Sequence, residues 1–125
     1  MLPSPNKKYD DLIDIGNDKT EIKIIFFSQN MESKEKEMVD LELGSTAVLL
    51  DETQKLLDSG YRTIILDMHY VDFIDAEGIW SLQEIYRKTE AVNGSFSVIN
   101  LRNQPKKILG FTQLLKKLCH PTTLK

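Results

Sequence analysis

The pattern of hydrophobic and polar positions is sharpest between residues 63 and 78. Thr63–Leu66 is a continuous run of apolar or β-branched residues, which is typical of a short strand buried on both faces, and Asp67 ends the run. A short connector should follow the strand. Beyond it we expect a second apolar set to face the core, formed by Val71, Phe73 and Ile74.

A helical pattern begins at Asp75, which is the predicted N-cap because aspartate is favoured at that position. Glu77 then lies in the first turn, where the helix dipole favours an acid. The helix should run to about Val92 and stop at Asn93-Gly94. The residues that we expect to be buried together between this helix and the preceding strand are Ile64, Leu66, Ile79, Leu82 and Tyr86.

The N-terminal half carries a predicted hairpin and a predicted helix. Leu12–Ile15 and Glu21–Phe27 are expected strands, and Gly16-Asn17-Asp18 between them suits the turn of a β-hairpin. Ser45 is the expected N-cap of a helix, since apolar residues recur after it at helical spacing. Ser59-Gly60 ends that helix in the way glycine commonly does.

The C-terminal part predicts one more strand and one more helix. Ser95–Leu101 reads as the strand, and Pro105 stands where proline is tolerated, in the first turn of a helix. The apolar face of this last helix, which Pro121 should close, comprises Ile108, Leu109, Phe111, Leu114, Leu115 and Leu118.

Residues 28–44 are polar and acidic, and the pattern leaves two interpretations open. They form an irregular loop, or Met38–Leu43 alternates as a brief extra strand. The expected order of elements is therefore β, β, α, β, α, β, α. Strands separated by a helix should be parallel and joined by right-handed crossovers. The pattern thus predicts an α/β fold with about four strands in a mixed sheet and helices packed mainly on one face.

The whole chain has the composition of an ordinary globular protein, with 125 residues and a formal net charge of −3. We expect a flexible tail over residues 1–8, a single domain over 9–120 and a C-terminal tail over 121–125. The negative charge argues against a nucleic-acid partner. A single cysteine, Cys119, and the lack of a signal peptide or an apolar run near 18 residues predict a cytoplasmic protein without membrane insertion.

The last 25 residues differ in charge from the rest, because they contain basic residues and no acid. Two interpretations are open: a solvated basic helix face, or a docking patch for a partner. The basic residues are Arg102, Lys106, Lys107, Lys116, Lys117 and Lys125.

Several motifs occur in the order and spacing of a known family. Phe73-Ile74-Asp75-Ala76-Glu77-Gly78-Ile79 resembles the family's apolar strand and Asp-Ser-Ser-Gly-Leu helix start. Leu82–Lys88 is similar to its apolar helix ending in tyrosine and basic residues, and Lys106–Leu114 to its basic-basic-Val-Leu-x-Leu-Thr-Gly-Leu segment. On these residues, roughly the C-terminal half of the chain resembles the STAS domain of anti-sigma factor antagonists.

The resemblance implies a STAS-like fold and a binding surface for an anti-sigma factor that is a serine kinase-like protein. The implied partner-binding residues are Asp75, Ala76, Glu77 and Gly78, with Trp80 nearby, where the family usually has a small residue. Trp80 is interpreted either as a partner anchor or as ordinary packing. We expect a monomer or a weak homodimer.

The resemblance also implies that Ala76 occupies the position of the phosphoacceptor serine and Glu77 that of the second serine. Alanine has no hydroxyl group, so this position cannot be phosphorylated. Three interpretations follow: a permanently binding-competent antagonist, a permanently inactive one in which Glu77 imitates phosphate, or a Glu77 that is only a favourable first-turn residue.

Other functions have weaker support in the sequence. A STAS subunit of a transporter or of a stress-signalling assembly is one alternative. A receiver-like phosphoacceptor using Asp67 is another, although such a domain needs an acidic pair after its first strand and five βα units. His69 and His120 have no acid–nucleophile arrangement around them. We therefore expect no catalytic activity, no metal and no cofactor.

Overall fold

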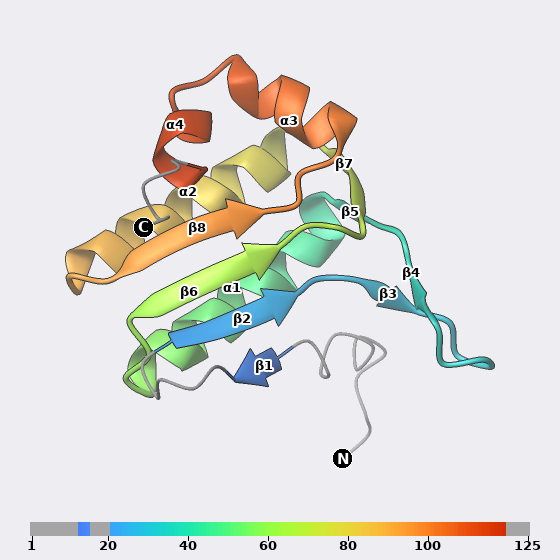
Figure 1. The fold of residues 1–125 in the computed structure, drawn as a ribbon, viewed down its shortest axis with the longest axis horizontal. Helices are drawn as coiled ribbons and strands as arrows, with labels where there is room; N and C mark the ends of the chain where they lie inside the picture. Colours follow the sequence, from blue (N-terminus) through green and yellow to red (C-terminus); the bar gives the residue numbers. More distant parts are fainter. Residues whose placement is uncertain (1–12, 16–20, 120–125) are drawn as a thin grey trace.

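A four-stranded sheet organises the chain in the computed structural model, which describes residues 13–15 and 21–119 (Figure 1). Its strands follow the order β1-β2-β6-β8. The parallel β2, β6 and β8 form three of them, and β1 adds an antiparallel edge next to β2. The predicted mixed sheet is confirmed, whereas the predicted turn at 16–18 and both predicted tails lie outside the described residues. The four strands are β1 (Ile13–Ile15), β2 (Glu21–Ile25), β6 (Thr63–Asp67) and β8 (Ser95–Ile99).

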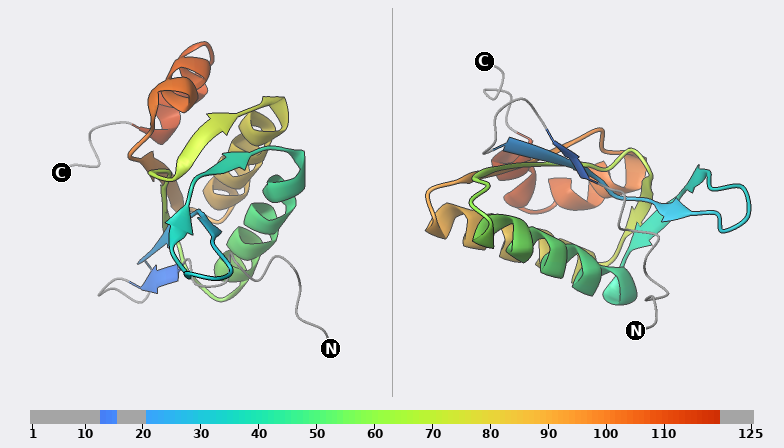
Figure 2. Two further views of the ribbon diagram at one scale, coloured as in Figure 1. Left: turned by 90° about the vertical axis from the view of Figure 1, so that its right-hand side faces the viewer. Right: turned by 90° about the horizontal axis from the view of Figure 1, so that it is seen from below.

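Two long helices, α1 (Leu43–Asp58) and α2 (Ala76–Ala91), lie side by side on one face of this sheet (Figure 2). Two shorter helices, α3 (Asn103–Gly110) and α4 (Leu114–Leu118), lie beyond β8 at the edge of the sheet (Figure 1). The prediction of helices mainly on one face is thus confirmed. A single long C-terminal helix was expected, but the chain turns at 111–113 and forms two.

Burial alternates along each central strand, because successive side chains point to opposite faces of a sheet. The buried members face the two long helices; they are Ile22, Ile24, Ile64, Leu66, Phe96 and Val98. The expectation that Thr63–Leu66 is buried on both faces is wrong, since Thr63 and Ile65 are only half-buried. With helices on one face, the other face carries half-buried side chains.

The buried stripe of α2 is rotated from the predicted one. Leu82 is fully buried as expected, but Ile79 and Tyr86 are half-buried on the flank of the helix. The sequence hides this rotation because two buried positions are polar. Their hydroxyl groups are satisfied within the helix, Ser81 donating to the Gly78 carbonyl at 2.8 Å and Thr89 to the Ile85 carbonyl at 2.7 Å.

The acidic segment before α1 contains three short strands. β3 (Ser28–Gln29) and β4 (Lys36–Glu37) pair as a small projecting hairpin, visible in Figure 1. β5 (Val39–Leu41) then pairs in parallel with β7 (Val71–Ile74), so the interpretation of a brief extra strand is confirmed. The second apolar set that was expected after the connector forms strand β7.

Two further expectations need correction. α1 begins at Leu43 with Glu42 as its N-cap, so Ser45 is the third residue of the helix and not its cap. Phe111, assigned to the apolar face of the last helix, is 79% exposed in the turn between α3 and α4. The break in the helix turns its ring away from the core.

Candidate functional site

The start of α2 is positioned by the short strand β7. β7 pairs with β5 so that Ile74 lies opposite Leu41, and the next backbone amide, that of Asp75, donates to the Leu41 carbonyl at 3.3 Å. The side-chain amide of Gln104 in α3 bonds both the backbone nitrogen of Ile74 at 2.9 Å and its oxygen at 3.1 Å. The backbone of Ile74, directly before the cap residue Asp75, is therefore held by β5 on one side and by the Gln104 side chain on the other.

Asp75 is the N-cap of α2, as predicted. Its backbone is extended, with φ of −104°, and its carboxylate accepts a hydrogen bond from the Gly78 backbone nitrogen at 2.9 Å. This bond satisfies one of the amides that a helix start leaves without an internal partner. The half-buried Asp75 side chain thus has a clear structural role.

Gly78 is buried where α2 crosses the end of β5. A Cβ atom at this position would lie 2.3 Å from the Leu41 carbonyl oxygen and 2.6 Å from Cγ2 of Ile74. Real Cβ atoms do not approach other atoms so closely, so only glycine allows the helix to come this near to the strand. Gly78 therefore lies beneath the exposed first turn and allows the helix to pack closely on the strand. A direct contact between Gly78 and a partner stays a prediction.

The outer surface of the helix start is formed by the other predicted site residues. Ala76 and Glu77 are exposed in the first turn, and Trp80, one turn further along, is 49% exposed. Ala76 and Trp80 are four residues apart and so share one stripe of the helix. The structure brings four of the five predicted residues to the surface or near it, and it places Gly78 beneath them.

Sequence reasoning missed one aromatic residue of this surface, Phe73. It was expected in the core with Val71 and Ile74, but its side chain is 42% exposed. Strict alternation would place Val71 and Phe73 on one face. Alternation fails here because the pairing of β5 with β7 shifts register between Val39 and Asp40.

The surface around the helix start is acidic. Asp40 lies opposite Phe73 in the β5–β7 pair, and both Asp40 and Asp72 are exposed. Glu42 caps the neighbouring helix, and Glu77 lies in the first turn of α2. Exposed acids therefore lie opposite and next to Phe73 on the β5–β7 pair, and one more, Glu77, lies in the turn of α2 before Trp80. The sequence signal for this arrangement is the run of acids before α1, which becomes informative only once β5 is paired with β7.

Further along α2, Glu84 is paired with Arg87 on the surface. The guanidinium Nη2 lies 2.6 Å from Oε1 of Glu84. This hydrogen bond lowers the pKa of the Glu84 carboxyl and raises the pKa of Arg87. Glu84, which shares the stripe of Ala76 and Trp80, is thus engaged within its own helix.

The two serines nearest the helix starts are inaccessible to a modifying enzyme. Ser81 is 0% exposed and bonded to the Gly78 carbonyl. Ser45 is also buried; its hydroxyl donates to the Asp40 carbonyl at 2.7 Å and accepts from the Glu42 nitrogen at 3.1 Å. Neither hydroxyl can replace the one that Ala76 lacks.

The receiver-like alternative at Asp67 finds no support in the geometry. The carboxylate of Asp67 is buried and accepts hydrogen bonds from the His69 backbone nitrogen at 2.9 Å and the Asn100 side-chain amide at 3.1 Å. Asp67 thus organises the loops that follow β6 and β8. Within the described ranges, 13–15 and 21–119, no cluster of three or more metal-binding side chains occurs.

Taken together, the sheet, the covering helices and the capped, exposed helix start define an α/β domain with a candidate binding surface at the start of α2. The sequence model of the STAS domain family matches residues 21–125, and the chain belongs to this family. A search of curated protein sequences finds no significant match.

Three solved structures illustrate the shared fold. The anti-sigma factor antagonist SpoIIAA in its unphosphorylated form is 17% identical, with a TM-score of 0.67, over 85% of this chain and 83% of its own. The phosphorylated form of the Bacillus cell fate determinant SpoIIAA is 16% identical, with a TM-score of 0.61, over 85% of this chain and 86% of its own. The murine Solute Carrier 26 family member A9 anion transporter is 19% identical, with a TM-score of 0.56, over 80% of this chain and 15% of its own. At these identities the likeness shows a shared fold.

One of these three structures is an anion transporter. Among the residues that the structure describes, no helix is both long enough and apolar enough to cross a bilayer.

Proposed function

We propose that this chain is an anti-sigma factor antagonist that binds a serine kinase-like anti-sigma factor in the bacterial cytoplasm. It works by competitive binding through the start of α2 and performs no catalysis itself. The partner, once bound, releases its sigma factor. The likeness to the anti-sigma factor antagonist SpoIIAA supports this function, and so does the exposed surface around Asp75, Ala76 and Glu77.

The observation that carries the proposal is the exposed methyl group of Ala76 on a well-capped helix start. The STAS resemblance assigns this position to the phosphoacceptor serine. Alanine leaves the geometry of the helix start intact but removes the acceptor oxygen, and the buried Ser81 and Ser45 cannot supply another. The chain is thus a binding-competent antagonist that phosphorylation at the helix start does not switch off.

Glu77 either imitates a phosphoserine or only stabilises the helix start. It is exposed one position along from Ala76 and carries one negative charge, whereas a phosphoserine carries about −1.5 to −2. In the helix start, a carboxylate is favoured by the helix dipole without any partner. Glu77 is therefore assigned a local stabilising role, and imitation of the phosphorylated state becomes an outcome that the experiment below detects.

The chemistry of the surface indicates the chemistry of the partner. Exposed Phe73 and Trp80 offer large aromatic area, and tryptophan is enriched among residues that dominate binding energy. The exposed acids of β5, β7 and the first turn of α2, Asp40, Asp72 and Glu77, favour a partner surface with basic residues at its rim. The proposed partner surface is an apolar pocket bordered by lysine or arginine.

The test begins with capture of the ATP-binding partner from the native cell extract, followed by affinity measurements with purified proteins. Trp80→Ala should weaken binding by about 2 kcal/mol or more, which is roughly 30-fold in Kd. Phe111→Ala is the matched control, because Phe111 is also an exposed aromatic but lies in the α3–α4 turn. It should leave the affinity nearly unchanged, and both variants should keep the melting temperature of the parent.

Equal loss of affinity in the two variants would place the interface elsewhere and contradict the proposal. Two further variants separate the interpretations of Ala76 and Glu77. Ala76→Ser should become a substrate of the partner kinase and lose affinity once phosphorylated. Glu77→Gln should change the affinity little; a large gain would show that Glu77 imitates phosphate and that the parent chain is inactive.

A second function, a STAS subunit of a transporter, is favoured by the likeness to the murine anion transporter. The same capture experiment, repeated on detergent-solubilised membranes, distinguishes the two. Recovery of a membrane transporter that competes for the Trp80 surface would replace the anti-sigma assignment.

A further inference from the structure

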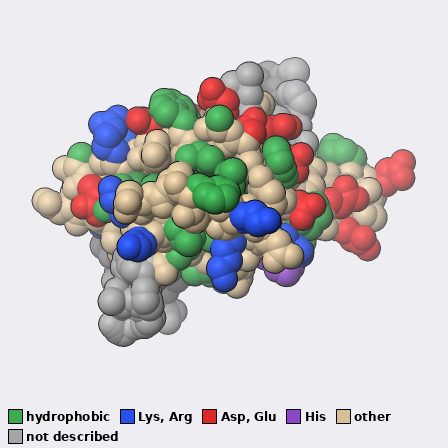
Figure 3. Space-filling view, turned by 90° about the horizontal axis from the view of Figure 1, so that it is seen from above, with side chains coloured by type: hydrophobic (Ala, Val, Ile, Leu, Met, Phe, Trp, Pro, Cys, Tyr) green, Lys and Arg blue, Asp and Glu red, His purple; other side chains and the backbone are tan. Residues whose placement is uncertain are grey.

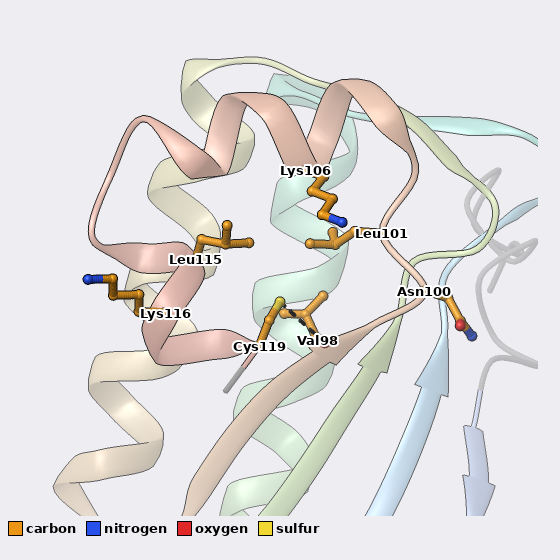
Figure 4. Close-up of a pocket in the computed structure, with 7 residues that line it drawn as sticks. All are labelled: Val98, Asn100, Leu101, Lys106, Leu115, Lys116 and Cys119. Carbon is orange, nitrogen blue, oxygen red and sulfur yellow. Dashed lines mark hydrogen bonds between the residues drawn. The ribbon is translucent and has the colours of Figure 1, made fainter. Parts of the chain in front are cut away.

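A hollow of about 550 Å³ lies between the end of β8 and the helices α3 and α4, and it shares no residue with the start of α2 (Figure 4). Its volume is in the range of small-molecule sites. Val98 on β8, Leu101 after it and Leu115 on α4 provide an apolar lining. In the close-up, Leu115 and the Cys119 side chain both point into the space that Leu101 borders.

Cations border this apolar lining. Lys106 extends from α3 toward Leu101, whereas Lys116 extends from α4 away from the other labelled side chains (Figure 4). The sequence from Leu101 to Cys119 contains no acid that could neutralise them. Figure 3 shows this side of the molecule, where hydrophobic side chains are bordered by Lys and Arg along one flank.

Cys119 is the remaining residue of the lining that could carry a charge. Its thiol is kept neutral. Its sulfur lies 3.5 Å from the Val98 carbonyl oxygen. Burial raises the pKa of Cys119, and the nearby Lys106 ammonium opposes this only in part. The hollow therefore combines a neutral, apolar wall with a positive charge at its rim.

We propose that this hollow binds an anionic amphiphile, a molecule with one carboxylate or phosphate group and one apolar chain. The chain lies against Leu101, Leu115 and Val98, and the anionic group pairs with Lys106. Each simpler ligand leaves half of the site unused. A free inorganic anion makes no use of the leucines, and a neutral hydrocarbon makes no use of the lysine. This site is independent of the partner surface at Asp75.

Cys119 is the only cysteine of the chain, so its alkylation by iodoacetamide reports on the hollow without labelling any other thiol. The protein is alkylated with and without dodecanoate, at concentrations below micelle formation. Dodecanoate should slow alkylation in proportion to the fraction of protein bound. Acetate, which has only the anionic group, and dodecyltrimethylammonium, which reverses the charge, should give little protection.

Lys106→Gln should weaken dodecanoate binding about tenfold, because it removes a charge-assisted contact. Lys107→Gln is the matched control; it changes the neighbouring exposed lysine, which does not line the hollow, and should change binding less than about twofold. Protection is compared within each variant as the ratio of rates with and without ligand, because Lys106 also acts on the pKa of the thiol.

Vesicles distinguish the source of the ligand. Protection by anionic phospholipid vesicles but not by neutral ones identifies a membrane lipid, and protection by dodecanoate alone identifies a free carboxylate; either result supports the site. Equal protection by dodecyltrimethylammonium, by acetate or by an acidic peptide would overturn the proposal. So would the absence of saturable protection by dodecanoate and by anionic vesicles.

Discussion

The starts of α1 and α2 are built from the same parts but carry different residues at the position that is buried in both. Each helix follows a short strand, β5 or β7, and the two strands pair with each other. In both helices the second residue, Gly44 or Glu77, is exposed and the third, Ser45 or Gly78, is buried. The buried position holds a serine that hydrogen-bonds the Asp40 carbonyl in α1, and a glycine that packs against the Leu41 carbonyl in α2.

The two starts also satisfy their backbone groups differently. In α2 the cap side chain itself, Asp75, accepts from a backbone amide of the first turn. In α1 the side chain of Ser45, in the first turn, accepts from the backbone nitrogen of the cap residue, Glu42, as one arm of a capping box. The third residue of each helix therefore takes part in the cap, Ser45 through its side chain and Gly78 through its backbone amide.

The largest expected effect compares one glycine in each first turn. Gly78→Ala should destabilise the protein by roughly 2 kcal/mol, since the new Cβ would collide with the Leu41 carbonyl and overpacking outweighs the gain in helix propensity. Gly44→Ala in α1 is the control: nothing lies within 4 Å of its Cβ position, so alanine should stabilise by about 0.5–1 kcal/mol. Urea denaturation of both variants measures the difference, and effects of the same sign would refute the close approach at Gly78.

The next effect concerns Ser45, which was expected to be the N-cap of α1 and is its third residue. Ser45→Ala should cost about 1.5 kcal/mol, because it leaves the Glu42 amide and the Asp40 carbonyl without this partner in a buried position. The free energy of unfolding gives the value. A loss of only a few tenths of a kcal/mol would mean that water replaces the hydroxyl and that solvent reaches the start of α1.

Removing the true cap should cost less. Asp75→Ala removes the bond to the Gly78 amide, and loss of an N-cap costs about 1 kcal/mol. Asp75→Asn is the control, since asparagine caps equally well and removes only the charge. If Asp75→Asn keeps its stability but loses partner affinity, then the carboxylate has a binding role in addition to its capping role.

The smallest effect is expected at the surface pair further along α2. Arg87 lowers the pKa of Glu84, so the pair stabilises the fold above the ordinary glutamate pKa and this contribution disappears as pH falls through the lowered value. Because the pair is exposed, Glu84→Gln should change the melting temperature at pH 7 by no more than about one degree. A clearly larger shift that vanishes at pH 3 would show that the pair is shielded from water.

The sheet, its mixed topology and the cap of α2 could be predicted because each depends on local signals. Alternation marks β2 and β8, and Asp75 stands directly before a helical pattern. The rotation of α2 could not be predicted, because Ser81 and Thr89 are polar in sequence but satisfied within the helix. Burial of such residues depends on hydrogen bonds that only the folded helix provides.

The candidate site was predictable in part for the same reason. The helix start was identified from Asp75 to Gly78, but the exposure of Phe73 and the acidic border depend on the pairing of β5 with β7. That pairing joins residues about 30 positions apart with a shift in register. Neither composition nor spacing along the chain contains this information.

The contact between Gln104 and Ile74 determines how a partner can bind near the helix start. Strand β7 has β5 along one side, and on its other side the amide of Gln104 occupies both the nitrogen and the oxygen of Ile74. The glutamine side chain thus stands in for the backbone of an additional strand. A partner peptide cannot extend this two-stranded sheet at Ile74 without first displacing α3. Recognition along this edge of β7 therefore depends on shape and side chains and not on β-strand addition.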